Sequence, residues 1–418
     1  MMGGANGQTQ VAGKDACPTS ARRPTLPAWR RAPRQRVPIP GTSRITCPCW
    51  FALLTGTLLG LLLFARFAPA FEPARPGYEY AFPRDHFSHP EFQTEWWYYT
   101  GNLFTAEGRR FGFELTFFRV GVERETPPES KWDIRDLYLA HLTLSDIETG
   151  KFYKAERLSR SGPGLAGADA GTARIWNGNW QVRWVGLGGP EERQKLGAVA
   201  EDFSLDLELA SAKAPVIHGR DGISRKSAEE GAASHYISLT RLNVSGSVRL
   251  NGQDHRVRGS AWMDHEFFTH EMDSGQVGWD WMSIQLDDET DLMLYRMRRN
   301  DGSADPHSSG TLVDAEGRVT HLDAADIVMQ PGKTWSSPDT GGRYPIKWKV
   351  SVPKLGISLD CRTPLLTQEV VSPRQIGPNY WEGAVDYEGV FGGKSVKGVG
   401  YLEMTGYDKR VVLGDTIH

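Results

Sequence analysis

One carboxyl group in this sequence stands among aromatic residues in a way that suits proton transfer. Asp264 lies in the segment Gly259-Ser260-Ala261-Trp262-Met263-Asp264-His265-Glu266, which Phe267 and Phe268 follow. A carboxyl group surrounded by apolar rings loses the hydration of its charged form, so its pKa rises and it can stay protonated near neutral pH. Asp264 is therefore a candidate general acid, with Trp262 as an aromatic neighbour of the reacting centre.

Further aromatic and histidine side chains occur in three short motifs. These are Glu95-Trp96-Trp97-Tyr98-Tyr99-Thr100-Gly101, Ser234-His235-Tyr236-Ile237-Ser238 and Gly278-Trp279-Asp280-Trp281. Three of these features also have a purely structural interpretation. The Trp96–Tyr99 run could pack at the floor of a barrel, and His235 could be a hydrogen-bonded core histidine. Asp264-His265 could be a structural charge pair.

The sequence does not predict a metal centre. His265-Glu266 and His270-Glu271 offer ligand types that zinc accepts, but a spacing of five residues does not place two histidines on one helical face. We therefore assign no metal ligand and expect no cofactor.

The elements that must carry these residues are β-strands. Apolar residues alternate with polar ones at Phe111–Phe117, Phe203–Leu209 and Ile346–Val352, and turn residues follow about every ten positions. Such alternation predicts antiparallel strands with one buried and one wet face, joined as hairpins. We expect an all-β fold, with Trp262, Asp264 and Glu266 on one face of their strand and His265 on the other.

The N-terminus is predicted to be an export signal. An apolar stretch runs from Trp50 to Ala65, seven arginines precede it, and Ala68-Pro69-Ala70 resembles a cleavage site. The stretch is shorter than the roughly 20 residues of a membrane span, and an uncleaved anchor is the alternative. We divide the chain into a leader at 1–70, an N-terminal domain at 78–271 and a C-terminal domain at 272–418.

Without the leader the protein is acidic. Residues 1–70 hold nine Lys or Arg and one Asp, so 39 basic and 50 acidic residues remain, a net charge of −11. This charge argues against nucleic-acid binding through the overall field. Cys361 is the single cysteine outside the leader, so no internal disulfide can form, which favours a bacterial periplasm.

The order of the motifs resembles that of the carotenoid 1,2-hydratase and AttH-like family. Glu-Trp-Trp-Tyr-x-Thr-Gly, the His-Tyr strand, Gly-x-x-Trp-x-Asp-His and Gly-Trp-x-Trp carry the resemblance, and Tyr380-Trp381-Glu382-Gly383 extends it. The family implies two tandem lipocalin-like antiparallel β-barrels. Its hydratases protonate a carbon–carbon double bond of a long apolar polyene and add water without a cofactor.

The resemblance assigns roles to particular residues. It places the hydratase residues on His235-x-Ile237 and Trp262-x-Asp264. On chemical grounds Asp264 would be the acid and His235 the base toward the attacking water. The carbocation would lie against an aromatic face, for which Trp262, Trp279, Trp281 and Tyr236 are the candidates. Ile237 and Trp262 differ from the residues of the hydratases, which puts a carotenoid substrate in doubt. With these residues we group Tyr236, Ile237, Trp279, Trp281 and Trp97 as ligand-binding candidates.

Two functions follow as expectations. The first is an exported, periplasmic or secreted protein that binds an apolar lipid, terpenoid or polyene in a barrel, as an accessory of an ABC-type transport system and membrane-proximal at most. The alternative is a cofactor-independent hydratase or cyclase acting on a carotenoid-like substrate.

Overall fold

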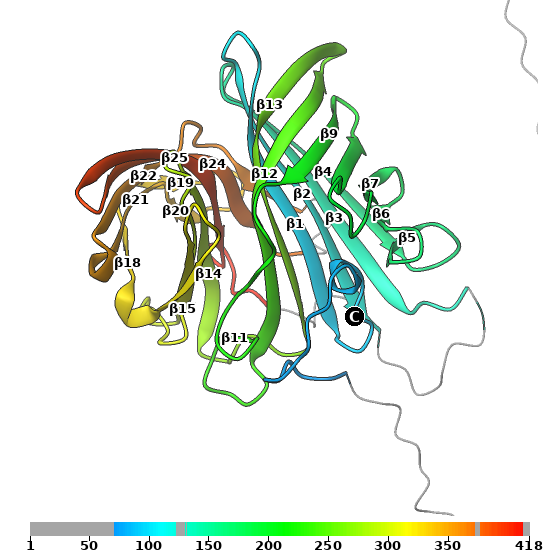
Figure 1. Ribbon diagram of the computed structural model, residues 1–418, viewed down its shortest axis with the longest axis horizontal. Coiled ribbons are helices and arrows are strands. Elements are labelled where there is room, and N and C mark those ends of the chain that lie inside the picture. The colour runs from blue at the N-terminus through cyan, green and yellow to red at the C-terminus, as the bar shows by residue number, and fades with distance from the viewer. Residues whose placement is uncertain (1–70, 123–129, 131, 373–376, 413–418) are drawn as a thin grey trace, which may run out of the picture. The chain divides into compact units, whose positions relative to one another are not determined.

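The computed structural model describes residues 71–122, 130, 132–372 and 377–412, which belong to one compact unit of residues 66–418. The predicted leader at 1–70 lies outside the described residues. Nearly all regular structure is antiparallel β-sheet (Figure 1). The only helical segments among these residues are three 3₁₀ turns, η2 (Arg84–His86), η3 (Ala324–Asp326) and η4 (Pro353–Leu355). Within this part of the chain, no helix combines the length and the apolar character needed to cross a membrane.

The first sheet has thirteen strands in the order β4-β3-β2-β1-β13-β12-β9-β8-β7-β6-β5, with β10 and β11 paired to β12. Its strands are β1 (Thr94–Phe104), β2 (Arg110–Gly121), β3 (Asp136–Asp146), β4 (Lys151–Arg160), β5 (Ala166–Asp169), β6 (Arg174–Asn177), β7 (Trp180–Val185), β8 (Arg193–Val199), β9 (Phe203–Ser211), β10 (Val216–Ile217), β11 (Ser224–Arg225), β12 (Ala233–Leu250) and β13 (Gln253–Phe268).

The second sheet has ten strands in the order β17-β16-β15-β14-β25-β24-β22-β21-β18, with β23 paired to β24 and a separate β19-β20 hairpin. Its strands are β14 (Gln276–Leu286), β15 (Asp291–Arg299), β16 (Ser309–Val313), β17 (Val319–Asp323), β18 (Val328–Pro331), β21 (Lys347–Val352), β22 (Ile357–Arg362), β23 (Glu369–Val370), β24 (Tyr380–Phe391) and β25 (Lys394–Thr405); the hairpin is β19 (Thr334–Ser336) and β20 (Arg343–Pro345). The predicted domain boundary at 271/272 falls in the connection between β13 and β14.

The first sheet curls into a nearly closed barrel. Asn177 of β6 donates from Nδ2 to the carbonyl of Tyr138 on β3 at 3.0 Å, and Ser159 of β4 donates to Asn177 Oδ1 at 2.7 Å. These bonds join strands from opposite ends of the sheet order. The barrel interior is packed with its own side chains, including Trp97, Tyr99 and the four phenylalanine and leucine residues that alternate along β2. The predicted all-β fold of two antiparallel, barrel-like sheets is confirmed.

The wet face predicted for one of the alternating strands is wrong. Along β2, Gly112, Glu114 and Thr116 are as buried as their apolar neighbours, because the second sheet covers the outer face of β1 and β2. The approach is close: a Cβ at Gly112 would lie 2.7 Å from the Tyr401 hydroxyl and 2.9 Å from Ala384 Cβ. Glycine is thus required at this crossing of the two sheets.

Polar bonds fix the two sheets to each other. Asn102 of β1 donates to the carbonyl of Gly400 on β25 at 3.1 Å, and Arg110 of β2 pairs with Asp386 of β24 at 2.5 Å. An apolar cluster lies between them, with members from both sheets: Tyr98, Tyr236, Trp262, Trp281, Met293, Tyr295, Met297, Ala384 and Tyr401. The sheets therefore share a buried aromatic interface in addition to their separate cores.

Candidate functional site

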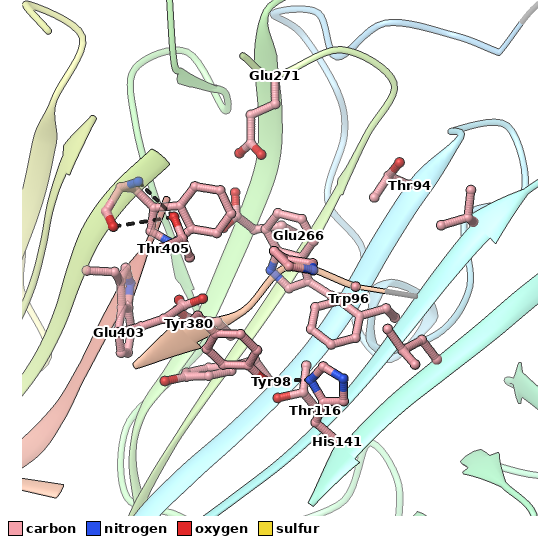
Figure 2. A pocket seen from close by; sticks show the side chains of 18 of the residues that line it. Thr94, Trp96, Tyr98, Thr116, His141, Glu266, Glu271, Tyr380, Glu403 and Thr405 are labelled. Carbon is pink, nitrogen blue, oxygen red and sulfur yellow. Dashed lines mark hydrogen bonds between the residues drawn. The ribbon is translucent and has the colours of Figure 1, made fainter. Parts of the chain in front are cut away.

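A cavity lined mainly by apolar side chains lies between the two sheets, and not inside the first barrel where a ligand was expected. Its walls come from the outer faces of β1, β2, β3 and β13 on one side and from β14, β15, β24 and β25 on the other (Figure 2). It offers about 130 Å³ to the centres of water-sized molecules, whereas one water needs roughly 10–15 Å³ by that measure. Apolar rings and aliphatic chains form most of the wall, among them Trp96, Tyr98, Phe118, Leu137, Leu139, Trp279, Trp281 and Met297.

Asp264 of β13 reaches this cavity and is held by three donors. Its Oδ1 accepts from the Trp262 indole at 2.6 Å and from the Ser238 hydroxyl, and its Oδ2 accepts from the Tyr236 hydroxyl at 2.5 Å. The register of the sheet explains the arrangement, since Ser238 of β12 and Tyr98 of β1 lie directly opposite Asp264. Trp281 of β14 in turn donates to the Tyr236 hydroxyl at 2.8 Å.

The Asp264 carboxyl is poised between its two protonation states at neutral pH. Burial raises its pKa to about 7, although the three hydrogen bonds favour the charged form. Oδ1 already accepts two bonds and Oδ2 only one, so Oδ2 has the remaining place for an acid proton. Asp264 can therefore act as a buried acid that delivers its proton from Oδ2.

A buried histidine that the sequence did not reveal stands behind this acid. His218 lies between Ser238 Oγ, 2.6 Å from its Nε2, and Thr311 Oγ1, 2.8 Å from its Nδ1. Because Ser238 donates to Asp264, Nε2 must donate to Ser238 and Nδ1 must accept from Thr311. Burial lowers the pKa of His218 to about 3, so it stays neutral and orients the Ser238 hydroxyl.

One end of the cavity contains a compensated positive charge. Lys226 Nζ lies 3.1 Å from Glu266 Oε2 and 3.3 Å from Glu271 Oε1, and it faces the rings of Tyr236 and Tyr295 at 4.9 and 4.3 Å. The ammonium group is thus already bound by two carboxyl groups and two aromatic faces.

The opposite end is acidic. Glu114 Oε1 accepts from Thr116 at 2.8 Å and from the Tyr380 hydroxyl at 2.9 Å, and His141 Nδ1 lies 2.6 Å from the same hydroxyl. Burial raises the pKa of Glu114 and raises that of Glu403, on β25, to about 8. In Figure 2, Glu403 lies on the side of the cavity opposite Trp96.

Five of the predicted residues lie together at this site. Asp264, Trp279 and Trp281 line the cavity, while Trp262 and Tyr236 support Asp264 through their hydrogen bonds. The predicted alternation along β13 is present as well: Asp264 and Glu266 face the cavity, and the His265 ring stacks on Trp97 on the barrel side at 4.8 Å.

His235, Ile237 and Trp97 are not at the cavity. His235 and Ile237 occupy the other face of β12 from Tyr236 and pack with Phe92 and Phe267. Since side chains alternate along a strand, two residues of odd number cannot share the face of Tyr236 and Ser238. Trp97 belongs to the barrel core and donates to the carbonyl of His86 at 3.0 Å. The assignments of His235 as base and of Ile237 and Trp97 as ligand contacts are therefore corrected.

We expect His235→Ala to leave ligand binding within about twofold of the wild type. The substitution removes a ring packed against Tyr78 at 4.5 Å and leaves the cavity walls unchanged, so it should lower the free energy of unfolding by roughly 2–4 kcal/mol. Ligand titration and urea denaturation on the same preparation measure both effects. A tenfold loss of affinity with unchanged stability would restore His235 to the site.

Glu95 and His265, both in prominent motifs, form a separate buried network. Glu95 accepts from Arg119 Nε at 2.8 Å and lies 2.7 Å from His89 Nδ1 and 2.9 Å from His265 Nε2. His89, Glu95 and His265 bring three potential metal-ligand atoms within 4.8 Å of one another. The same atoms bond one another, however, and Arg119 adds a positive charge, so the set is satisfied without an ion. His270 is about half exposed and bonds Glu229, so it does not belong to the network of His265 and Glu95.

The sequence also failed to reveal the acidic half of the cavity. Glu114, His141, Tyr380 and Glu403 come from four separate strands that only the packing of two sheets brings together. One signal was available: a glutamate between Phe113 and Leu115 on a strand whose alternate residues are all apolar. That pattern looks the same for a wet face and for a face covered by a second sheet.

Comparisons with known proteins agree with this architecture. The family model described as AttH-like matches residues 73–407. A crystal structure from Nitrosomonas europaea described as AttH is 32% identical, has a TM-score of 0.72, and its alignment covers 81% of this chain and all of that one. Kievitone hydratase from Nectria haematococca has a TM-score of 0.62 at 14% identity, with 82% of this chain and 98% of that chain covered, which is a likeness of fold. No match was found among curated proteins.

Proposed function

Because this chain belongs to the AttH-like family and carries an apolar cavity between its two sheets, we propose that it binds an apolar small molecule there. The observation that carries the proposal is a cavity walled by aromatic rings around a few convergent polar groups, the composition expected of a ligand site. Lipid, terpenoid and polyene ligands all fit this wall chemistry.

A neutral fluorescent probe tests binding at this cavity. N-phenyl-1-naphthylamine should gain fluorescence with the wild type. Leu139→Trp fills the cavity from β3 and should weaken binding at least about tenfold, equivalent to 1.4 kcal/mol. The matched control is Leu165→Trp, because Leu165 is 45% exposed and is not one of the residues that line the cavity. Equal titrations for Leu139→Trp and the wild type would reject the proposal.

A second function, acid catalysis, is favoured by the geometry at Asp264. The electron pair of a substrate double bond would take the proton from Oδ2, which forms a C–H bond, a carbocation and the Asp264 carboxylate. Water would add to the carbocation, and the same carboxylate would accept the proton that the added water releases. Trp281 and Tyr98 offer aromatic faces at the cation. This hydratase-type step needs no cofactor and no contribution from His235.

Asp264→Asn separates catalysis from binding. Since a positioned acid contributes about 10²–10⁴ in rate, turnover of any hydrated polyene or terpenoid should fall at least a hundredfold, whereas probe binding should persist. Product formation is followed by mass spectrometry as an increase of one water. Unchanged turnover in a variant that still binds would leave binding as the function.

We further propose that the protein acts outside the cytoplasm, as an accessory of an ABC-type transport system. The basic and apolar N-terminal segment supports export, and the ligand chemistry suits a carrier. Amino-terminal sequencing of the protein from the periplasmic fraction should begin near residue 71. An intact N-terminus in the cytoplasmic fraction would contradict it.

A further inference from the structure

The polar part of the cavity wall is predominantly acidic. Five carboxyl residues line it: Glu114, Asp264, Glu266, Glu271 and Glu403. Lys226 and His141 are the basic groups among the lining residues. Because Lys226 forms ion pairs with Glu266 and Glu271, its positive charge does not compensate the other carboxyl groups. Among the described residues, no salt bridge compensates Glu114, Asp264 or Glu403.

Glu114 has an unfilled hydrogen-bonding site. Its side chain is fully buried and lines the cavity. Oε1 accepts two hydrogen bonds, whereas Oε2 makes none of good geometry, since the nearby Thr143 hydroxyl contacts the carboxyl group without a well-aligned bond. Glu382 of β24 shows the same asymmetry, with Oε1 bound by Tyr98 at 2.6 Å and Oε2 unpartnered. A buried acceptor without a donor costs about 1–3 kcal/mol, and a ligand that supplies the donor recovers that loss.

We propose that the ligand carries a protonated amine that binds Glu114 while its apolar part lies against the tryptophans. The proposal rests on the binding function proposed above and narrows its ligand class. An ammonium group provides three donors and no acceptor, which matches a wall rich in acceptors. The surrounding rings of Trp96, Trp279 and Trp281 also favour a cation. An anionic ligand would be repelled by the acidic wall. Lys226, the lysine among the described lining residues, is already paired with two carboxyl groups.

The protonation states around Glu114 are compatible with such a ligand. Burial raises the pKa of Glu114, so the empty site can avoid an uncompensated charge, and an incoming ammonium favours the ionised form. The titratable groups that face Glu114 come from four strands: Tyr98 on β1, His141 on β3, Tyr380 and Glu382 on β24, and Tyr401 and Glu403 on β25. The proton that Glu114 loses passes to solvent.

Three probes of equal chain length test the amine. Decylamine, decan-1-ol and decanoate are titrated calorimetrically at pH 7 below their micelle concentrations. We expect decylamine to bind at least about tenfold tighter than decan-1-ol, because a charge-assisted hydrogen bond is about twice as strong as a neutral one. Decanoate should bind most weakly. Glu114→Gln keeps the shape of the side chain and should abolish the preference for amine over alcohol without loss of alcohol binding.

A control variant and three further outcomes test whether Glu114 selects an amine. The exposed Glu201→Gln serves as the matched control and should retain the preference. Decanoate binding as tightly as decylamine, or a full amine preference in Glu114→Gln, would overturn the inference. If Glu114→Gln does not fold, Glu403→Gln from the opposite sheet should reduce the preference instead. Decan-1-ol binding that is identical in wild type and Leu139→Trp would reject the proposed function itself, whatever the amine does.

Discussion

Glu95→Gln should destabilise the protein by about 3–5 kcal/mol, the usual effect of breaking a buried ion pair on one side. Glu95 is completely buried and bonds Arg119, His89 and His265. Although burial alone would raise the pKa of Glu95, Arg119 and the two imidazoles hold it well below its usual range. The substitution keeps the shape but removes the charge, which leaves the buried Arg119 without its main counter-ion. Urea denaturation at pH 7 measures the loss.

The control for Glu95 is an ion pair on the surface. Arg362 and Glu388 are 2.6 Å apart with side chains 56% and 48% exposed, and Glu388→Gln should change stability by about 1 kcal/mol or less. A similarly small effect for Glu95→Gln would mean that the network is not a structural anchor. The comparison also tests a role of Glu95 in binding. If Glu95→Gln were stable but lost ligand binding, Glu95 would be assigned to the ligand site.

Asp264→Asn should change how stability depends on pH. The pKa of Asp264 rises from 3.8 to about 7 on folding, so between these values the folded state binds a proton that the unfolded state has lost. Stability from this group is fully present below pH 3.8 and is lost as the pH rises through 7. Since one pKa unit corresponds to about 1.4 kcal/mol, the total is on the order of 4 kcal/mol. The asparagine variant cannot lose a proton and should not show this decline.

The difference between the two proteins isolates the Asp264 contribution. Burial also raises the pKa of Glu271 and of Glu403 to about 8, and their contributions have the same sign, but they are present in both proteins and largely cancel. Urea denaturation at pH 4.5, 6, 7 and 8 should show the wild type losing stability relative to Asp264→Asn at every step. Parallel curves would show that Asp264 is ionised in the folded protein throughout this range.

The sequence predicted the strands well because alternation is a local property. The side chains of Phe111, Phe113, Leu115 and Phe117 face one core, as their spacing requires, and the same rule correctly separated Asp264 from His265. The same alternation places His235 and Ile237 on one face of β12 and Tyr236 and Ser238 on the other. Alternation alone does not say which of these two faces meets the cavity. The pairing of Ser238 on β12 with Asp264 on β13 shows that it is the face of Tyr236 and Ser238.

The position of the cavity could not be predicted from the sequence, for a different reason. A polar residue between apolar ones predicts water on its face of the sheet, and Glu114 instead faces Tyr380 of the second sheet. Which face of one sheet a second sheet covers depends on long-range packing, and no local pattern records it. The aromatic motifs therefore predicted the right neighbourhood, whereas the expected site inside the barrel was displaced to its outer wall.

Native mass spectrometry of the protein purified from its own source tests the central claim most directly. We predict that the wild type and Leu165→Trp carry an apolar small molecule, released on collisional activation, and that Leu139→Trp carries none because the new indole fills the cavity between the sheets. The same adduct on Leu139→Trp, or no adduct on any of the three proteins, would contradict a ligand site at this cavity.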